Sequence, residues 1–254
     1  MANSPKAHGP MRKLGHEIAA SLLELFLPAS CLACGQPPVR EERAVMLCRG
    51  CRNEIEPITE PLCTCCGQQF RNSGGGNHLC GLCLSDHYHF TMARALLRYT
   101  PPITKVISRF KYHGRTAALK TFRTLHEQIP VPGLIDRPDL IIPVPLHRKR
   151  LRERGFNQAL LLARAFYPDH GSLIDFAVLE RQRYTAPQTS LSGKARRQNL
   201  KKAFRVKNSE VVAGKRVLLI DDVFTTGTTV NECAAVLKKA GAKEVAVLTL
   251  ARVD

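Results

Sequence analysis

The 254-residue sequence lacks any apolar run of the ~20 residues that a membrane-spanning helix requires. The stretch Ile18–Leu27 is apolar, but Glu24 interrupts it and its apolar residues recur at helical spacing. We therefore expect an amphipathic helix here rather than a signal peptide. A chain that is not exported stays in the cytoplasm, where paired cysteines remain reduced. We expect a cytoplasmic protein without membrane insertion, whose cysteines bind metal rather than form disulfides.

The sequence is also poor in acidic and aromatic residues. There are 21 Asp and Glu against 38 Lys and Arg, and residues 91–254 alone hold 30 basic and 13 acidic residues, which equals the net charge of +17. Such an excess attracts nucleic acid or phosphate-rich ligands, although a solvated surface that aids solubility is the alternative. Tryptophan is absent, and aromatic residues are 6% of the chain. This scarcity weakens base stacking and leaves phosphate binding open. The modest stacking candidates are Phe110, Tyr112, Phe156 and Tyr184.

Cysteine is scarce outside one region, because nine of the ten cysteines lie between Cys31 and Cys83. Eight of the nine form four Cys-x2-Cys pairs, and the last two pairs repeat the first two after 32 residues. Two such pairs complete the tetrahedral four-sulfur shell of a structural zinc ion. We predict two zinc ions, with the ligands Cys31, Cys34, Cys48, Cys51, Cys63, Cys66, Cys80 and Cys83.

Other arrangements of these cysteines stay open at this point. The first four and the last four ligands form the simplest two sets, and an interleaved pairing is the alternative. An iron–sulfur cluster or redox-active disulfides are the competing chemistries. Cys65 and Cys233 are left over, and the nearby His78, His87 and His89 are not needed as ligands.

A strand that ends in two acids follows much later in the chain, at Val217–Asp222. Its branched apolar residues indicate a buried strand of a parallel sheet, and ligands bind at the carboxyl ends of such strands. The loop G-x-x-x-x-G-K-[ST] of nucleotide triphosphatases is missing, which excludes that class. The loop Thr225–Thr229 and a helix from about Val230, with Gly241 as its C-cap, come next. Backbone N–H groups at such a helix start favour a phosphate group.

The stretch Val217–Thr229 resembles the motif with which type I phosphoribosyltransferases bind 5-phosphoribosyl-1-pyrophosphate (PRPP). The resemblance implies that two acids order the ribose and hydrate a Mg²⁺ ion, and that the loop binds the 5-phosphate. The residues concerned are Asp221, Asp222, Thr225, Thr226, Gly227, Thr228 and Thr229. If the protein is an enzyme, Asp221 and Asp222 are its catalytic residues.

In such enzymes the first core strand ends in a loop that holds pyrophosphate. The stretch Asp139–His147 reads as a strand with a proline-rich turn, so Leu146, His147 and Arg148 are the candidates for this loop. Arg183 joins them from the basic segment 183–204, which we expect to close over the diphosphate. The alternative is that these arginines bind no ligand and simply form a solvated surface.

Motifs along nearly the whole chain resemble the ComF family of competence proteins, which includes GntX-like proteins. The motifs are the Cys-x2-Cys pairs, Phe110–Gly114, Pro143–His147, Arg150–Gln158, Arg183-x-Thr185-x2-Gln188 and the PRPP motif. The resemblance implies a cytoplasmic protein of natural transformation that handles incoming single-stranded DNA, with other DNA-uptake or recombination proteins as partners. It does not identify a phosphoribosyl acceptor. A metabolic phosphoribosyltransferase with an unidentified acceptor and a PRPP-binding regulator without turnover are therefore the alternatives.

The expected fold is α/β, with a type I phosphoribosyltransferase-like parallel sheet flanked by helices and an N-terminal double zinc ribbon. Residues 1–30 are expected to form a tail and amphipathic helix, residues 31–90 the zinc ribbons, and residues 91–254 the phosphoribosyltransferase-like domain. Strands are expected near 139–143, 177–181, 216–221 and 244–250, and a helix at 158–166.

Overall fold

The computed structural model describes residues 30–37, 45–71, 74–85, 88–113, 117–184, 200 and 202–253. The expected helix at Ile18–Leu27 and most of the expected loop at 183–204 lie outside these residues. In the described part of the chain, no helix has both the length and the apolar character needed to cross a membrane.

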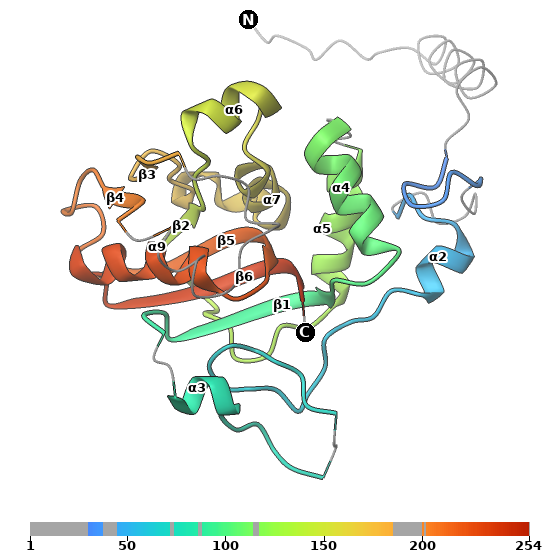
Figure 1. The fold of residues 1–254 in the computed structure, drawn as a ribbon, viewed down its shortest axis with the longest axis horizontal. Helices are drawn as coiled ribbons and strands as arrows, with labels where there is room; N and C mark the ends of the chain where they lie inside the picture. Colours follow the sequence, from blue (N-terminus) through green and yellow to red (C-terminus); the bar gives the residue numbers. More distant parts are fainter. Residues whose placement is uncertain are drawn as a thin grey trace, which may run out of the picture.

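A sheet of four parallel strands forms the centre of the molecule (Figure 1). In spatial order its strands are β1 (Met92–Arg98), β6 (Glu244–Arg252), β5 (Arg216–Phe224) and β2 (Leu140–Pro143). The two central strands consist mostly of Val, Leu, Ile and Ala and are buried over nearly their whole length. Near-continuous apolar runs of this kind are typical of parallel strands covered on both faces.

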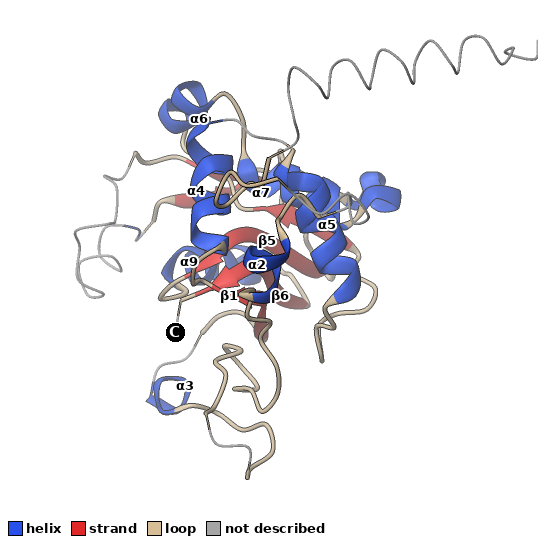
Figure 2. Ribbon diagram, turned by 90° about the vertical axis from the view of Figure 1, so that its right-hand side faces the viewer, coloured by secondary structure: helices blue, strands red, loops and turns tan. Residues whose placement is uncertain are grey.

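Helices cover both faces of this sheet (Figure 2). One face packs against α4 (Ile103–His113), α5 (Ala118–Gln128) and α7 (Gln158–Phe166), with the 3₁₀ helix η2 (Pro168–Leu173) beyond them. The other face packs against α9 (Thr228–Lys239) and the antiparallel pair β3 (Leu179–Arg181) and β4 (Phe204–Val206). The short helix α6 (Arg148–Arg154) stands above the end of β2 (Figure 1).

The cysteine segments form two ribbons that sit at different places on the sheet domain (Figure 1). The first ribbon, residues 30–37 and 45–53 with α2 (Arg49–Asn53), packs beside α4 and α5. There the Met46 N–H donates to Thr121 Oγ1 at 2.9 Å, and Arg109 donates to the carbonyl of Leu32 at 2.7 Å. Cysteine Cys31 accordingly belongs to the apolar cluster of that face of the sheet.

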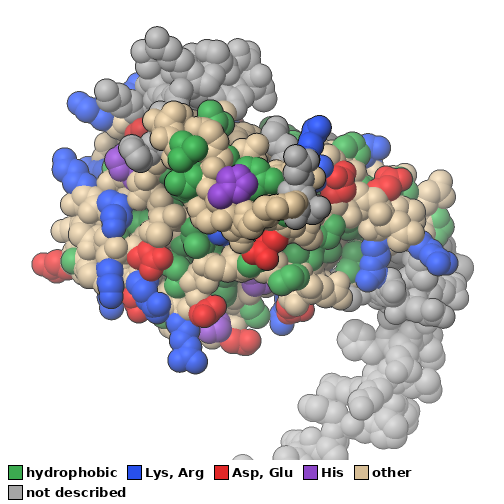
Figure 3. All heavy atoms as spheres, turned by 90° about the horizontal axis from the view of Figure 1, so that it is seen from below, with side chains coloured by type: hydrophobic (Ala, Val, Ile, Leu, Met, Phe, Trp, Pro, Cys, Tyr) green, Lys and Arg blue, Asp and Glu red, His purple; other side chains and the backbone are tan. Residues whose placement is uncertain are grey.

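The second ribbon, residues 61–71 and 74–85 with α3 (Gly81–Ser85), lies against the edge strand β1. The Ala93 N–H donates to the carbonyl of Cys65 at 2.7 Å, and the Ile58 N–H of the preceding linker donates to the carbonyl of Leu96 at 3.0 Å. These contacts cover a strand edge that would otherwise offer its backbone groups to other chains. On the end of the molecule that carries this ribbon, acidic side chains occur among the basic ones (Figure 3).

The structure confirms the expected α/β fold and several of its elements. The expected strands 139–143, 216–221 and 244–250 correspond to β2, β5 and β6, and the expected helices correspond to α7 and α9. Gly241, with φ of 93°, adopts the left-handed conformation expected after α9. The strand expected near 177–181 corresponds to β3, but β3 pairs antiparallel with β4 outside the main parallel sheet.

Candidate functional site

The eight cysteines predicted as zinc ligands gather into two quartets. The first quartet contains Cys31, Cys34, Cys48 and Cys51, and the second contains Cys63, Cys66, Cys80 and Cys83. In each quartet the Sγ atoms all lie within 4.8 Å of one another. The sequential assignment is therefore confirmed and the interleaved pairing is wrong. Four sulfur atoms at this spacing fit the closed tetrahedral shell of a structural zinc ion.

One thiol in each quartet has a lowered pKa. Burial opposes ionisation of Cys31 and Cys63, but hydrogen bonds from nearby backbone N–H groups outweigh it and lower the pKa of each to about 6. These two cysteines are equivalent in the 32-residue repeat. Because zinc binds thiolates, an acidified thiol at the same place in both quartets favours metal ligation.

Among the described residues, Cys65, Cys233 and His78 stay outside the quartets. Burial raises the pKa of both Cys65 and Cys233, so neither is prepared to act as a thiolate. His78 stacks on Phe70 with the ring centroids 4.0 Å apart, and its Nδ1 lies 2.9 Å from the carbonyl oxygen of Gly76. His87 lies outside the described residues.

The two acids Asp221 and Asp222 lie near the carboxyl end of β5 and face opposite sides of the sheet. Strand alternation places Asp221 on the same side as Leu219, which packs toward α9, and Asp222 on the same side as Ile220, which packs toward α4. Asp222 is only 6% exposed. The two carboxylates thus meet different neighbours although they are adjacent in sequence.

An ion pair joins Asp222 to Lys111 of α4, with Nζ 2.5 Å from Oδ2. Burial opposes the charge of Lys111, but the carboxylate of Asp222 and then that of Asp221 raise its pKa. The sequence analysis assigned no role to Lys111, although it lies in the stretch Phe110–Gly114 that carries part of the family resemblance. The feature of the sequence that could have pointed to Lys111 is its place directly after Phe110, which is fully buried in α4.

Asp221 is the most perturbed carboxyl group at this end of the sheet. Burial, followed by the negative charge of Asp222, raises its pKa to about 7. Its Oδ1 accepts a hydrogen bond from the Asp222 N–H at 2.9 Å. Arg181 of β3 also interacts electrostatically with Asp221, while burial, followed by the positive charge of Arg150, lowers the pKa of Arg181. Lys111 of α4 and Arg181 of β3 therefore interact with the paired acids, and Arg150 of α6 lies close to Arg181.

Residues 225–229, which we call the phosphate loop, comprise the turn after β5 and the first two residues of α9. Gly227 is the N-cap of α9 and has a φ of 70°, and a Cβ atom built there would lie 2.6 Å from the ring of Phe224. Only glycine fits this close left-handed position without strain. Thr226 Oγ1 lies 2.7 Å from Thr228 Oγ1. Thr225 and Thr226 are exposed, so the loop presents hydroxyl groups to solvent at a helix N-terminus, where anions are favoured.

The four residues predicted to hold pyrophosphate are only partly brought together. The His147 Nδ1 accepts from the Lys149 N–H at 3.2 Å and so caps α6, of which Arg148 is the first residue. Both line a cavity of about 440 Å³ together with Glu180, Arg181, Gln182 and Arg205. Leu146 and Arg183 are not among its lining residues. The basic run 148–154 is a helix, although the sequence predicted a loop at its start.

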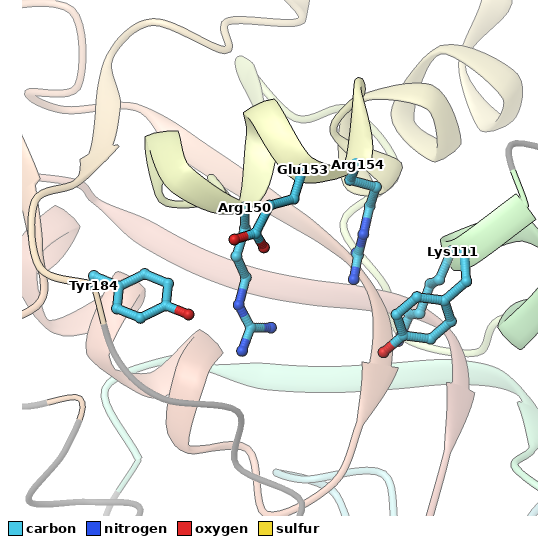
Figure 4. Close-up of a pocket in the computed structure, with 6 residues that line it drawn as sticks. Lys111, Arg150, Glu153, Arg154 and Tyr184 are labelled. Carbon is cyan, nitrogen blue, oxygen red and sulfur yellow. The ribbon is translucent and has the colours of Figure 1, made fainter.

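A second cavity, of about 270 Å³, separates α6 from α4 (Figure 4). Arg150, Glu153 and Arg154 project into it from α6, Lys111 enters from α4, and Tyr184 closes the opposite side. The remaining lining residue is Tyr112. The Arg154 guanidinium lies over the ring of Tyr112, with its Cζ 5.4 Å from the ring centroid. The Lys149 ammonium lies over the ring of Tyr184, with its Nζ 4.7 Å from the ring centroid. Through Lys111 this basic, aromatic cavity adjoins Asp222.

Comparisons with known proteins agree with this architecture. A model of the double zinc ribbon domain matches residues 22–84, and a model of the phosphoribosyl transferase domain matches residues 154–254. Competence protein F of Haemophilus influenzae is 36% identical over 214 residues, which cover 81% of this chain and 90% of that protein. DNA utilization protein YhgH of Escherichia coli O157:H7 is 34% identical over 90% of this chain and 99% of that protein. Competence protein ComFC of Bacillus subtilis is 29% identical over 81% of this chain and 84% of that protein.

Proposed function

This chain belongs to the ComF family of competence proteins, and we propose that it acts in DNA uptake, binds PRPP with Mg²⁺ at the end of β5, and contacts single-stranded DNA through the basic surface around α6. The observation that carries the PRPP part of the proposal is the arrangement at the end of β5. There a pair of acids with cationic neighbours stands directly before a glycine-capped helix N-terminus.

The chain's own residues divide the work of binding. The backbone N–H groups and threonine hydroxyls of the phosphate loop bind the 5-phosphate at the N-terminus of α9. The carboxylates of Asp221 and Asp222 accept hydrogen bonds from the ribose hydroxyls. The negative charge of the diphosphate is stabilised by arginines of α6 and β3, namely Arg148, Arg150 and Arg181.

The donor set suits a magnesium ion. Asp222 Oδ2 is paired with the Lys111 ammonium at 2.5 Å, so the remaining carboxylate oxygens of Asp221 and Asp222 would hold the ion. Carboxylate oxygens are the ligands that Mg²⁺ prefers in proteins, usually with substrate phosphates and water completing the shell. When bound, the ion neutralises charge on the diphosphate. No side chain is needed as a nucleophile, because the bond to the diphosphate leaving group breaks at the anomeric carbon as an external acceptor attacks.

The DNA part of the proposal rests on α6 and its surroundings. Five of the seven residues of α6 are Lys or Arg and one is Glu, and none of the seven is buried. Tyr112 and Tyr184 are 71% and 43% exposed on either side of the adjoining cavity. Exposed aromatic rings within a basic groove are the usual means of holding single strands without sequence preference.

Titration calorimetry of the zinc-loaded protein with PRPP and Mg²⁺ tests the first part. We expect Asp222→Asn and Asp221→Asn each to weaken binding at least tenfold (about 1.4 kcal/mol). The matched control is Asp139→Asn, an acid at the opposite end of the sheet whose side chain accepts from the Arg216 N–H. Binding that survives in both site variants, or is lost equally in the control, would exclude this site.

Salt-dependent binding of a fluorescent oligothymidine tests the second part. Replacing Arg150 and Arg154 with Gln removes two phosphate contacts and should reduce the slope of log affinity against log salt by about 1.4. Arg123→Gln, on α5, should leave the slope unchanged. A wild-type protein that binds PRPP but shows no salt-dependent DNA binding would favour the metabolic phosphoribosyltransferase instead.

A further inference from the structure

A chain of side-chain contacts runs from the second cysteine quartet to the phosphate loop. The second ribbon is seated tightly on the sheet, because a Cβ atom at Gly67, where φ is 70°, would lie 2.4 Å from the carbonyl oxygen of Ala93. Two arginines, both 7% exposed, hold the ribbon from the strands beneath it. Arg94 of β1 donates to the carbonyls of Cys63 and Thr64, at 3.4 and 3.3 Å.

Arg252, the last residue of β6, contacts the second cysteine of the same Cys63-x2-Cys66 knuckle. Its Nη1 donates to the carbonyl of Cys66 at 2.6 Å, and its Nη2 lies 3.8 Å from the Cys66 Sγ. A zinc ion with four thiolates carries excess negative charge, so a guanidinium beside one of the sulfurs is favoured. Partners of this kind orient metal ligands from outside the first shell.

The same guanidinium also lies over the ring of Phe224, with its Cζ 4.9 Å from the ring centroid. Phe224 is the register partner of Arg252 and the residue directly before the phosphate loop. Its ring fills the space that a side chain at Gly227 would need. One buried arginine therefore touches a zinc ligand on one side and the residue that supports the phosphate loop on the other.

A second, shorter connection reaches the loop from the segment between the second ribbon and β1. The Tyr88 hydroxyl donates to the carbonyl of Thr226 at 3.4 Å, and the His89 N–H donates to Asn231 Oδ1 at 2.7 Å. Tyr88 stacks on Phe90 at 4.6 Å, and Phe90 meets Phe224 edge to face at 6.2 Å. The loop is thus held on two sides by groups fixed to the second ribbon.

The first quartet has no such connection within the described ranges. Its contacts lead to α4 and α5, through Arg109 and Thr121, on the other face of the sheet. The two ribbons are close repeats in sequence, so their different placement separates two roles that the sequence does not distinguish.

We propose that Arg252 is a positioning residue that couples the second zinc site to the phosphate loop, so that the second quartet, unlike the first, sets the conformation in which the loop binds phosphate. The ligand part of this inference rests on the proposed PRPP function. The structural part, that the loop is ordered from the second ribbon, stands without it.

Hydrogen–deuterium exchange of the zinc-loaded full-length protein measures the structural part without any ligand. In Arg252→Met the amides of residues 224–231 should exchange at least about tenfold faster than in the wild type. The matched control is Arg94→Met, which removes an equally buried arginine that holds the same ribbon but makes no contact with Phe224. In Arg94→Met the loop amides should keep their protection. Equal exchange of the loop in both variants would overturn the proposal.

Calorimetry with PRPP and Mg²⁺ then tests the ligand part. Arg252→Met should weaken binding by about tenfold, and Arg252→Lys should not restore it, because an ammonium does not reproduce the two-sided fork. If Arg252→Met does not fold, Phe224→Leu tests the same link from the loop side and should give the same two changes. A wild type that fails to bind PRPP would reject the proposed function, whereas fast loop exchange confined to the Arg252 and Phe224 variants would still support the coupling.

Discussion

Among single residues, Asp221 has the clearest consequence for pH. Its folded pKa is raised to about 7, from an ordinary value near 4, because burial and the charge of Asp222 disfavour the ionised form. The folded state therefore binds a proton more tightly than the unfolded state does. The contribution to stability is full below pH 4 and is lost as the pH rises through 7.

We predict that ionisation of this residue lowers the free energy of unfolding of the wild type between pH 4.5 and pH 8, by roughly 3 kcal/mol. Asp221→Asn, which cannot ionise, should show a correspondingly smaller decrease when urea denaturation is compared at the two pH values. PRPP affinity should change in the opposite direction and increase from pH 6 to pH 8, because the ionised carboxylate accepts the ribose hydroxyls. A pH dependence of stability identical in both proteins would contradict the raised pKa.

The ion pair between Lys111 and Asp222 predicts strong coupling between two residues far apart in sequence. Only 20% and 8% of their side-chain surfaces are exposed, so removing one partner leaves the other charge buried without compensation. Lys111→Met and Asp222→Asn should each lower the free energy of unfolding by about 3 kcal/mol. The double variant should lose much less than the sum. Additive losses in this double-mutant cycle, measured by urea denaturation, would show that the pair does not interact.

At the level of elements, the turn from β5 into α9 depends on Gly227. Gly155→Ala is the matched comparison, since Gly155 also has a positive φ, of 81°, but has open space where its Cβ would lie. Gly155→Ala should therefore cost only the backbone strain, about 1 kcal/mol. Gly227→Ala adds the clash with Phe224 and should cost about 3 kcal/mol of stability. Equal losses in the two variants would mean that the loop can move away from the ring.

The helices and strands that were predicted correctly are those whose local sequence alone carries the pattern of that element. Strand β5 and helix α9 combine apolar runs, acids and a glycine-capped turn in one continuous stretch. Strand β1 was missed because Arg94 interrupts its apolar pattern. This arginine is buried because carbonyls of Pro132 and of the second ribbon, distant from it in sequence, accept its hydrogen bonds. Helix α6 was missed as an element because five basic residues mask any apolar face.

The candidate site shows the same limit. Both acids, the phosphate loop and the two quartets follow from local motifs. Lys111 was not found, because its meaning depends on an acid that only the folded sheet brings beside it. Arg252 is likewise explained by Cys66 and Phe224, which are distant from it and from each other in sequence. Tertiary partners of this kind leave no spacing pattern.

For the whole molecule, the two ribbons extend the small four-stranded sheet in different directions. The first adds apolar surface to the α4 and α5 face, and the second covers the edge of β1 and accepts hydrogen bonds from two buried arginines. Zinc binding supplies folding free energy to each ribbon. Loss of the second zinc should therefore remove the ribbon carbonyls that accept from the buried Arg94 and Arg252 and expose a strand edge, which loss of the first does not. Arg94 keeps the carbonyls of Pro132 and Ala93 as acceptors.

We predict that Cys63→Ser lowers the free energy of unfolding by at least about 2 kcal/mol more than Cys31→Ser does. The comparison is closely matched, because both thiols are fully buried, both have a pKa near 6 and both occupy the same position in the repeat. Urea denaturation with zinc in excess measures the difference, and zinc release should show one ion per variant against two in the wild type. Cys65→Ser, beside the quartet but outside it, should keep both ions and controls for the loss of a thiol. If the two ligand variants were equally destabilised, Arg94 and Arg252 would find other acceptors when the ribbon opens, and the second ribbon would not secure the sheet through them.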